Sequence, residues 1–267
     1  MPTNLAKAHA YGNDFLYERA DDWSRRDWSA HARRTCDRHR GAGADGLIIY
    51  APTASGARMR LFNADGSDSE VSGNGVRGLA AWLCWKATEA GRTLPGELII
   101  DTDAGPKRLE LLAAEGPRFT LRAAMGPPTE VTQTTLDAAG ERVTAIVLRV
   151  GNPQCVVLEP VLDEERYRRL GPALATHVAF PHGTNVEFAH VTHPRRVDIL
   201  IWERGVGPTL ASGTGACAAA VAAMAYGGAE RSVDVVSPGG AQRVDWTDDG
   251  LFLTGWAEVV WEGQWID

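Results

Sequence analysis

Residues 63–84 read NADGSDSEVSGNGVRGLAAWLC, and residues 203–224 read ERGVGPTLASGTGACAAAVAAM. Each stretch has a polar loop, then Ser-Gly-polar-Gly, and then an alanine-rich run that predicts a helix. The two serines, Ser72 and Ser212, are separated by about half the chain, which is too long a period for a solenoid repeat. We therefore expect a molecule of two similar lobes that carry the same device.

The segments around these loops predict mostly strands, because they are rich in Val, Ile and Leu and are bounded by Gly, Pro or Asp. The expected strands include Gly46–Tyr50, Arg58–Phe62, Glu97–Thr102, Arg118–Ala123, Val143–Val150, Cys155–Leu158, Val197–Glu203 and Leu251–Thr254. The expected helices are Ala20–His39, Val76–Ala90, Asp163–Leu174 and Ala216–Tyr226. Because strands outnumber helices and do not alternate regularly with them, we predict an α+β fold.

The composition excludes several classes of protein. Hydrophobic residues make up 44% and charged residues 23% of the 267 residues, so a packed core is expected. The net charge of −7 comes without a basic stripe, which argues against nucleic-acid binding. We find no apolar run of the roughly 18 residues that a membrane span needs and no signal-peptide core, so we expect a cytoplasmic protein. The four cysteines form no CxxC pair, which argues against zinc and indicates free thiols.

Three glycine-rich segments match the spacing of a dinucleotide fingerprint: Gly41–Gly46, Gly73–Gly78 and Gly213–Ala218. The first is followed by a strand-like segment rather than a helix. The other two open helices, but each follows a long polar loop instead of the tight turn that a pyrophosphate site requires. A nicotinamide or flavin enzyme is therefore the weaker alternative.

The last two loops have another interpretation. A helix N-terminus presents unpaired N–H groups and a partial positive charge, so it can hold a carboxylate and lower the pKa of a thiol. Two such termini facing each other would place the side chains at 72 and 212 on opposite faces of one amino acid, which permits stereoinversion without a cofactor. The simpler interpretation is that Ser72 and Ser212 only cap helices. The loops alone support both interpretations equally.

Six motifs add a resemblance. In order and spacing they resemble the diaminopimelate epimerase family, from the N-terminus to about Val221, with a weaker echo in LTGWAEVVWEGQW at 253–265. The motifs are AYGNDFLY at 10–17, RGAGADGLII at 40–49, MRLFNADGS at 59–67, GNPQCVV at 151–157, GTNVEF at 183–188 and ERGVGPTLASGTGACAAA at 203–220. Six motifs in order are far more specific than one glycine loop.

The resemblance implies a fold of two similar lobes of mixed, mostly antiparallel sheet, each wrapped around a central helix. The segment AAMGPP at 123–128 interrupts the strand pattern and marks the boundary. We place residues 1–123 in the first lobe and 124–253 in the second. By resemblance, the C-terminal strand 254–267 returns to the first lobe, and the site lies between the lobes.

The resemblance also implies a function, which is the cofactor-independent epimerisation of LL-diaminopimelate to the meso form. The substrate has two α-amino-acid ends, one inverted and one gripped. The catalytic positions are then Ser72 and Ser212, and Glu203 accepts the ammonium group or tunes the adjacent base. The matching substrate-binding residues are Asn13, Asn63, Gly73, Asn74, Asn152, Asn185, Glu203, Arg204, Gly213 and Thr214. No metal, pyridoxal phosphate or nucleotide is implied, and the sequence admits a homodimer without specifying one.

Three positions depart from the family's pattern, which has cysteine at 72 and 212 and usually histidine at 154, where this chain has Gln154. A free thiol is partly ionised near neutral pH, whereas a serine hydroxyl needs an adjacent base, which Gln154 cannot provide. Two origins remain open: deliberate replacement of the cysteines, or a natural relative with altered chemistry or none. The alternative functions are a racemase or isomerase of another amino acid and a non-catalytic amino-acid-binding homologue.

Overall fold

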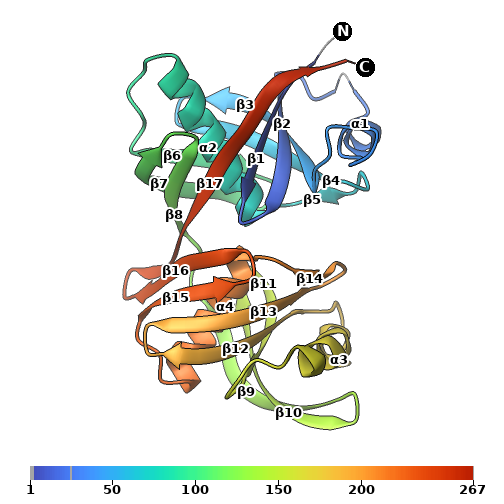
Figure 1. Cartoon of the computed structure of the whole chain (residues 1–267), viewed down its shortest axis with the longest axis vertical. Coiled ribbons are helices and arrows are strands. Elements are labelled where there is room, and N and C mark those ends of the chain that lie inside the picture. The colour runs from blue at the N-terminus through green and yellow to red at the C-terminus, as the bar shows by residue number, and fades with distance from the viewer. Residues whose placement is uncertain (1–2, 25, 267) are drawn as a thin grey trace. The chain divides into compact units, whose positions relative to one another are not determined.

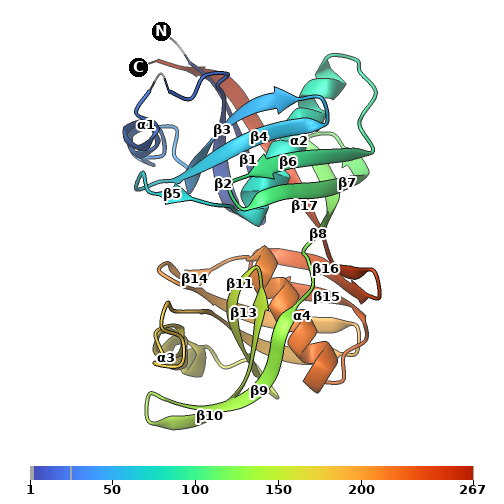
Figure 2. The same ribbon diagram turned by 180° about the vertical axis from the view of Figure 1, so that it is seen from behind.

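The computed structural model describes residues 3–24 and 26–266 (Figure 1), and the chain divides into two compact units. The first unit comprises Met1–Ala123 with Gly255–Asp267, and the second comprises Ala124–Thr254. Figure 2 shows the same chain from behind, with a helix packed inside the strands of each unit. This arrangement confirms the predicted α+β class.

The first unit begins with two strands and alternates short strands with two helices. Its elements are β1 (Thr3–Ala10), β2 (Asn13–Arg19), α1 (Trp28–Thr35), β3 (Gly46–Thr53), β4 (Gly56–Asn63), β5 (Asp68–Ser69), α2 (Gly73–Glu89), β6 (Glu97–Thr102), β7 (Gly105–Glu115) and β8 (Arg118–Ala124).

The second unit repeats this order after one additional strand. Its elements are β9 (Thr129–Ala138), β10 (Glu141–Val150), β11 (Asn152–Leu158), α3 (Glu164–Ala175), β12 (Asn185–His193), β13 (Arg196–Glu203), β14 (Gly207–Thr209), α4 (Gly213–Tyr226), β15 (Ser232–Ser237) and β16 (Gly240–Thr247). The last strand, β17 (Gly250–Trp265), pairs with β16 over its first residues and with β1 from Glu258 to Trp265.

Strand pairing follows the same scheme in both units. In the first, β3 lies parallel to β2 and antiparallel to β4, and β4 pairs with β5 and β6. In the second, β12 lies parallel to β11 and antiparallel to β13, and β13 pairs with β14 and β15. The repeat seen in the sequence is therefore a repeat of topology.

The register makes the repeat exact at the level of residues. Tyr17 pairs with Ile48, Ile48 with Leu61, and Leu61 with Ser69. In the second unit, the corresponding row across the sheet is Val156, Glu187, Ile201 and Thr209. Each residue of one row thus has an equivalent in the other, and Ile48 is the equivalent of Glu187.

Alternation along the strands separates two faces of the second sheet. Val156 and Ile201 pack with α4, whereas Val157 and Phe188 pack on the side of α3. Because successive side chains of a strand point to opposite faces, Glu187 shares the α4 face with Val156 and Ile201. α4 is apolar on every side and almost wholly buried, as expected for a helix inside a core.

The helix predicted at Ala20–His39 is wrong in extent, because α1 covers only Trp28–Thr35. Asp22 accepts hydrogen bonds from the backbone N–H and hydroxyl of Ser24, which gives a turn in place of the first helical residues. The side chain of Asp27 caps α1, and Asp37 accepts from the two backbone N–H groups of His39 and Arg40 after its end. The other predicted helices are present, and α2 and α4 begin three residues earlier than expected.

None of the four cysteines forms a disulfide, which agrees with the prediction of thiols, and all four are buried. Among residues 3–24 and 26–266, no helix is long and apolar enough to cross a membrane.

Candidate active site

The first turn of α2 is built on Ser72. This residue has extended backbone angles, and its hydroxyl oxygen accepts a hydrogen bond from the Gly75 N–H at 3.1 Å. A serine N-cap satisfies one of the four N–H groups that a helix start leaves unpaired. The remaining N–H groups at a helix start can donate hydrogen bonds to an anion placed beyond the N-terminal end of the helix.

The first turn of α4 repeats this geometry. Ser212 is the N-cap, and its hydroxyl oxygen accepts from the Gly215 N–H at 3.2 Å and lies 3.5 Å from the Thr214 hydroxyl. Ser212 is only 6% exposed. The two predicted catalytic positions therefore occupy equivalent places in the two units.

Glycine is needed at the third residue of each loop because the sheet lies directly beneath it. A Cβ on Gly75 would lie 2.7 Å from the Ile48 side chain, and one on Gly215 would lie 2.7 Å from a carboxylate oxygen of Glu187. The Gly-x-Gly spacing thus serves the close approach of helix and sheet. It does not form the pyrophosphate turn of a dinucleotide site.

Five of the predicted residues, which we call the first cluster, lie at the start of β2, the end of β4 and the start of α2: Asn13, Asn63, Ser72, Gly73 and Asn74. Asn74 donates a hydrogen bond to Asn13 at 3.2 Å, and Asn13 donates to Asp45 at 2.7 Å. Asn63 donates to the Ser67 hydroxyl within its own turn. Sequence analysis did not select Asp45, which anchors Asn13.

Asp14 and its cationic partners fix the base of the first cluster. Burial opposes ionisation of Asp14, but hydrogen bonds from Arg38 and Lys7 outweigh it and lower the pKa of this carboxyl group to about 2. Arg38 also bonds Asp45, so the carboxylate that anchors Asn13 is itself fixed.

Seven residues, which we call the second cluster, gather where β11, β12 and β13 meet the start of α4: Asn152, Asn185, Glu203, Arg204, Ser212, Gly213 and Thr214. The amide oxygen of Asn152 accepts from Gln154 at 2.6 Å, and Gln154 pairs across the sheet with Asn185. The Asn185 amide oxygen accepts the backbone N–H of Arg204 at 2.9 Å. The sheet register therefore brings three of the separate sequence motifs together.

The side chain of Arg204 lies at the edge of the second cluster. Its guanidinium group is exposed and donates to the carbonyl oxygen of His182 at 2.8 Å. It borders a cavity of about 370 Å³ that is also lined by Gly183 and Trp202. A guanidinium held by one carbonyl keeps further N–H donors for a carboxylate.

A group of buried polar atoms in the second unit was missed by sequence analysis. Both carboxylate oxygens of Glu187, the amide oxygen of Gln154 and the hydroxyl of Thr209 have no hydrogen-bond partner in the described structure. Glu187 lies within NVEFA, where its neighbours are apolar, and this charged residue in a buried strand was the available signal. Burial and the charge of Glu203 raise the pKa of Glu187 well above its usual value.

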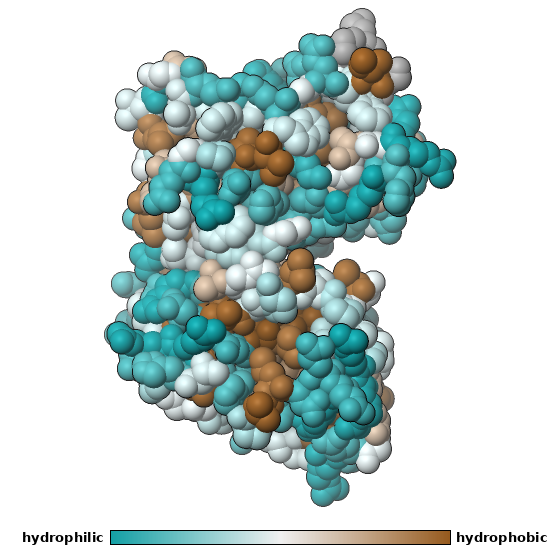
Figure 3. All heavy atoms as spheres, viewed as in Figure 1, coloured by the Kyte–Doolittle hydropathy of each residue, from teal (hydrophilic) through white to brown (hydrophobic). Residues whose placement is uncertain are grey.

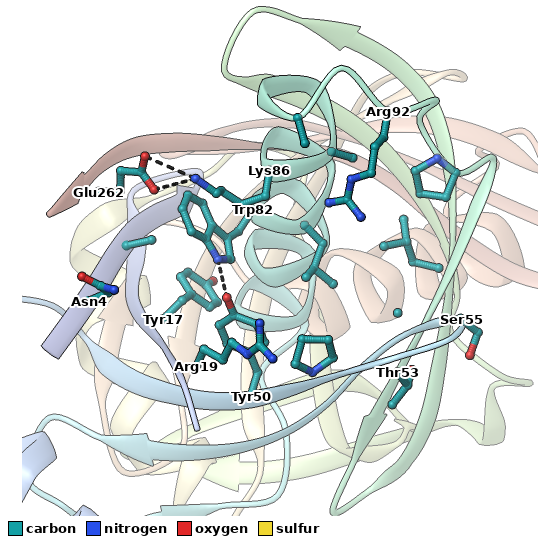
Figure 4. Close-up of a pocket in the computed structure, with 18 of the residues that line it drawn as sticks. Asn4, Tyr17, Arg19, Tyr50, Thr53, Ser55, Trp82, Lys86, Arg92 and Glu262 are labelled. Atoms are coloured by element: carbon teal, nitrogen blue, oxygen red, sulfur yellow. Dashed lines mark hydrogen bonds and ion pairs between the residues drawn. The ribbon is translucent and has the colours of Figure 1, made fainter. Parts of the chain in front are cut away.

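A cavity of about 1100 Å³ lies in the first unit at the other end of α2 (Figure 4). Its lining includes Trp82, which donates to the Tyr50 hydroxyl at 2.8 Å, and Lys86, which bonds Glu262 at 3.1 Å. No residue of the first cluster lines it. We therefore locate the candidate site by the helix caps and the sheet register, and not by cavity size.

On the face drawn in Figure 3, apolar side chains gather mainly on the second unit, between hydrophilic side chains. The exposed apolar residues of this unit include Val206 and Leu210, which flank β14 and so border the second cluster. The polar groups of the second cluster therefore have apolar neighbours.

Comparison with known proteins identifies the family. A family model described as diaminopimelate epimerase matches residues 5–131 and 146–260. The diaminopimelate epimerase of Desulforudis audaxviator is 41% identical over 279 residues, which cover 98% of this chain and 99% of that protein. The diaminopimelate epimerase of Desulfitobacterium hafniense is 36% identical over 279 residues, and the match covers 97% of this chain and 96% of that protein. The chain belongs to the diaminopimelate epimerase family.

Solved structures show the same fold at lower sequence identity. A predicted epimerase from Pseudomonas aeruginosa superposes with a TM-score of 0.74 at 15% identity, over 99% of both chains. A hydroxyproline epimerase from Agrobacterium vitis superposes with a TM-score of 0.71 at 16% sequence identity, over 98% of this chain and 92% of that one. Like its relatives, this member of the diaminopimelate epimerase family is an isomerase by descent, with serine at positions 72 and 212.

Proposed function

We propose that the chain interconverts LL- and meso-diaminopimelate without a cofactor, as a step of lysine biosynthesis, and that its two serines make the reaction slow. The observation that carries the proposal is the duplicated cap. Ser72 and Ser212 each begin a buried helix, and each accepts a glycine N–H three residues on, at 3.1 and 3.2 Å. One chain thus holds two matched positions from which a side chain and free N–H groups can meet an amino acid.

Proton transfer at the α-carbon requires a base on one face and an acid on the other. A group at 72 or 212 takes the α-proton, and the opposite group supplies a proton to the carbanion. The N–H groups of Gly73-Asn74 and Gly213-Thr214 hold the reacting carboxylate, which spreads the negative charge that develops. A hydroxyl at a helix N-terminus remains protonated near neutral pH, so the chain has two acids and lacks a base.

The distal end of diaminopimelate is a second α-amino acid, and the grip that we propose matches it. Asn63, Asn152 and Asn185 provide amide donors and acceptors for ammonium and carboxylate, and Arg204 provides a carboxylate donor. Glu203 accepts the substrate ammonium or tunes the adjacent base, and Asn13 serves the reacting end. A one-ended amino acid would leave this second set unused.

Deuterium exchange tests the proposal. Incorporation of deuterium from D₂O into LL- and meso-diaminopimelate is followed by NMR for the parent, Ser72→Cys, Ser212→Cys and the double variant. We expect very slow exchange or none in the parent and an increase of orders of magnitude in the double variant, because a thiol at a helix N-terminus ionises near neutral pH. Each single variant supplies one base, so exchange should outpace inversion.

Two results contradict this account. If the parent epimerises as fast as the double variant, serine is the working base and a neighbour such as Glu203 activates it. If the double variant is inactive, either the substrate is another amino acid or Gln154 has removed a necessary group.

The serines also favour a second candidate function, binding of an amino acid without turnover. Calorimetry with meso-diaminopimelate, lysine and histidine separates the candidates. Tighter binding of lysine or histidine than of meso-diaminopimelate counts against the proposed substrate.

A further inference from the structure

The carboxyl group of Glu187 has an unusual environment within the second unit. The residue is 0% exposed, and neither of its carboxylate oxygens has a hydrogen-bond partner in the described structure. Leaving a buried polar group unpaired lowers stability, and an acidic side chain is seldom fully buried without a partner. A position of this kind indicates that something other than stability retains the residue.

Glu187 packs against the loop that carries Ser212. A Cβ added at Gly215 would lie 2.7 Å from a carboxylate oxygen of Glu187 and 3.2 Å from the Ser212 Cβ. The N–H of the same Gly215 donates to the Ser212 hydroxyl oxygen. The carboxyl group therefore lies directly beneath the first turn of α4.

The first unit provides an internal comparison. Ile48 is the register equivalent of Glu187, and its side chain lies as close to Gly75 as Glu187 lies to Gly215. The fold therefore accepts an apolar side chain beneath the first turn of the helix. A carboxyl group is not needed there for packing, and only the second unit has one.

The state of this carboxyl group matters for the helix start above it. Burial, and then the charge of Glu203, raise the pKa of Glu187 well above its usual value, which favours the neutral form of the carboxyl group. An ionised carboxylate here would oppose the partial positive charge of the α4 N-terminus, whereas a neutral acid leaves it available to an anion. A neutral acid also has an O–H donor, and the unpaired amide oxygen of Gln154 lies on the same face of the sheet.

We propose that Glu187 is a positioning residue of the second cluster, whose carboxyl group beneath Gly215 holds the Ser212–Thr214 loop in the geometry that a substrate carboxylate or a base at position 212 needs. This inference rests on the proposed function for the identity of the ligand. It makes the two clusters unequal, because the first has Ile48 in the same place.

The first arm of the test uses no ligand. In the Ser212→Cys background, the pKa of the introduced thiol is measured from the ultraviolet absorbance of the thiolate, with Glu187 kept or changed to Gln or Ile. Glu187→Gln keeps a neutral hydrogen-bonding group, so the thiol pKa should not change. Glu187→Ile should raise it, because the thiolate loses the N–H groups that the loop presents. The matched control is Ile48→Val in the Ser72→Cys background, where no change is expected.

Two results of this arm overturn the inference. If Glu187→Gln lowers the thiol pKa by about one unit or more, Glu187 carries a negative charge and is not a neutral acid. If Glu187→Ile leaves the thiol pKa unchanged, the carboxyl group does not position the loop.

The second arm measures stability in the parent background by urea unfolding. Glu187→Ile should be more stable than the parent at neutral pH, because the parent buries an unpaired carboxyl group. Glu187→Gln should also be more stable there, because an amide does not titrate and so avoids the cost of the raised pKa. With its folded pKa above the unfolded one, Glu187 makes the parent lose stability as pH rises above the unfolded value. The free energy of unfolding of Glu187→Gln should therefore exceed that of the parent by an amount that grows from pH 5 to pH 8. A difference that shrinks over this range would show that Glu187 is not a neutral acid in the folded protein.

The titratable groups near Glu187 are few, so this pH dependence can be assigned. Glu203 lies on β13 and Cys155 on β11, and the pKa of Cys155 is raised to about 12 by burial and by Glu187. α4 contributes the buried Cys217 near its start and the exposed Tyr226 at its far end.

The third arm measures the dissociation constant of meso-diaminopimelate by calorimetry. Glu187→Ile should weaken binding roughly tenfold, the scale of one hydrogen bond lost between a loop N–H and the substrate carboxylate, although the change stabilises the fold. Glu187→Gln should restore binding to within a few-fold of the parent, and equal binding by the parent and Glu187→Ile overturns the inference. A parent that binds no diaminopimelate overturns the proposed function instead, and the first two arms still decide the role of Glu187.

Discussion

Serine and cysteine differ by one atom, and at a helix N-terminus that atom decides which side chain can ionise. Ser72 and Ser212 make the N-cap hydrogen bonds of α2 and α4, so serine serves the fold at both positions. The positive end of a helix lowers the pKa of a thiol, whereas a serine hydroxyl at the same place stays protonated near neutral pH. Under the proposed function, the capping role and the chemical role of these two positions are therefore separable in this chain.

Arg204 offers a prediction at the same scale. Arg204→Ala should weaken binding of meso-diaminopimelate by about 1.5–3 kcal/mol, the scale of a charged hydrogen bond, because it removes the donor for the distal carboxylate. Calorimetry measures the change. Arg168→Ala is the control, since Arg168 is exposed on α3 and pairs only locally with Glu164. An unchanged dissociation constant for Arg204→Ala shows that this residue does not meet the ligand.

Among the elements, sequence patterns located α2 and α4 but misjudged α1. Both α2 and α4 start at a Ser-Gly-x-Gly segment, in which the serine predicts an N-cap, and each segment is followed by an apolar run that predicts a helix. Residues 20–27 have a helix-favouring composition, but Asp22 accepts a local hydrogen bond in a turn and Asp27 caps α1, so the helix begins later than predicted. The part of the prediction at Arg25 lies outside the described residues. The sequence marks Glu187 as a charged residue among apolar neighbours, but it cannot show that the carboxylate oxygens are unpaired, because that depends on which strands and helix the fold packs around them.

The contact between α2 and β2 gives a prediction at the element scale. A Cβ on Gly78 would lie 2.1 Å from the Tyr17 hydroxyl, which donates to the Gly75 carbonyl oxygen at 3.0 Å. Gly78→Ala should therefore lower the free energy of unfolding by about 1–3 kcal/mol, the usual cost of overpacking, despite the better helix propensity of alanine. Urea unfolding measures the change.

Two further variants decide whether that contact is the cause. Gly96→Ala should cost little, because nothing lies within 4 Å of its Cβ position. In a Tyr17→Phe background, the cost of Gly78→Ala should be smaller, since the clashing oxygen is gone. An equal cost in both backgrounds means that another contact is responsible.

At the scale of the whole molecule, the two units share one topology, but one is built from a continuous segment and the other from two segments of the chain. The second unit is continuous from Ala124 to Thr254, whereas the first needs Gly255–Asp267 from the other end of the chain. Within β17, Ala257 and Val259 are buried, and Trp261 and Trp265 pack against the core beside α1. The first unit is thus complete only after β17 has been synthesised.

Removal of residues 255–267 should therefore affect the two units unequally. The first unit loses the partner of β1, which exposes backbone groups of that strand and apolar surface beneath it. The second unit keeps its pairing between β16 and β17 through Thr254. Hydrogen exchange followed by mass spectrometry should show lost protection in β1, β2 and α2, with protection retained in β12, β13 and α4, because cooperative units open separately. Equal loss of protection in both units would mean that they fold as one cooperative body, and the second unit would then not be an independent folding unit.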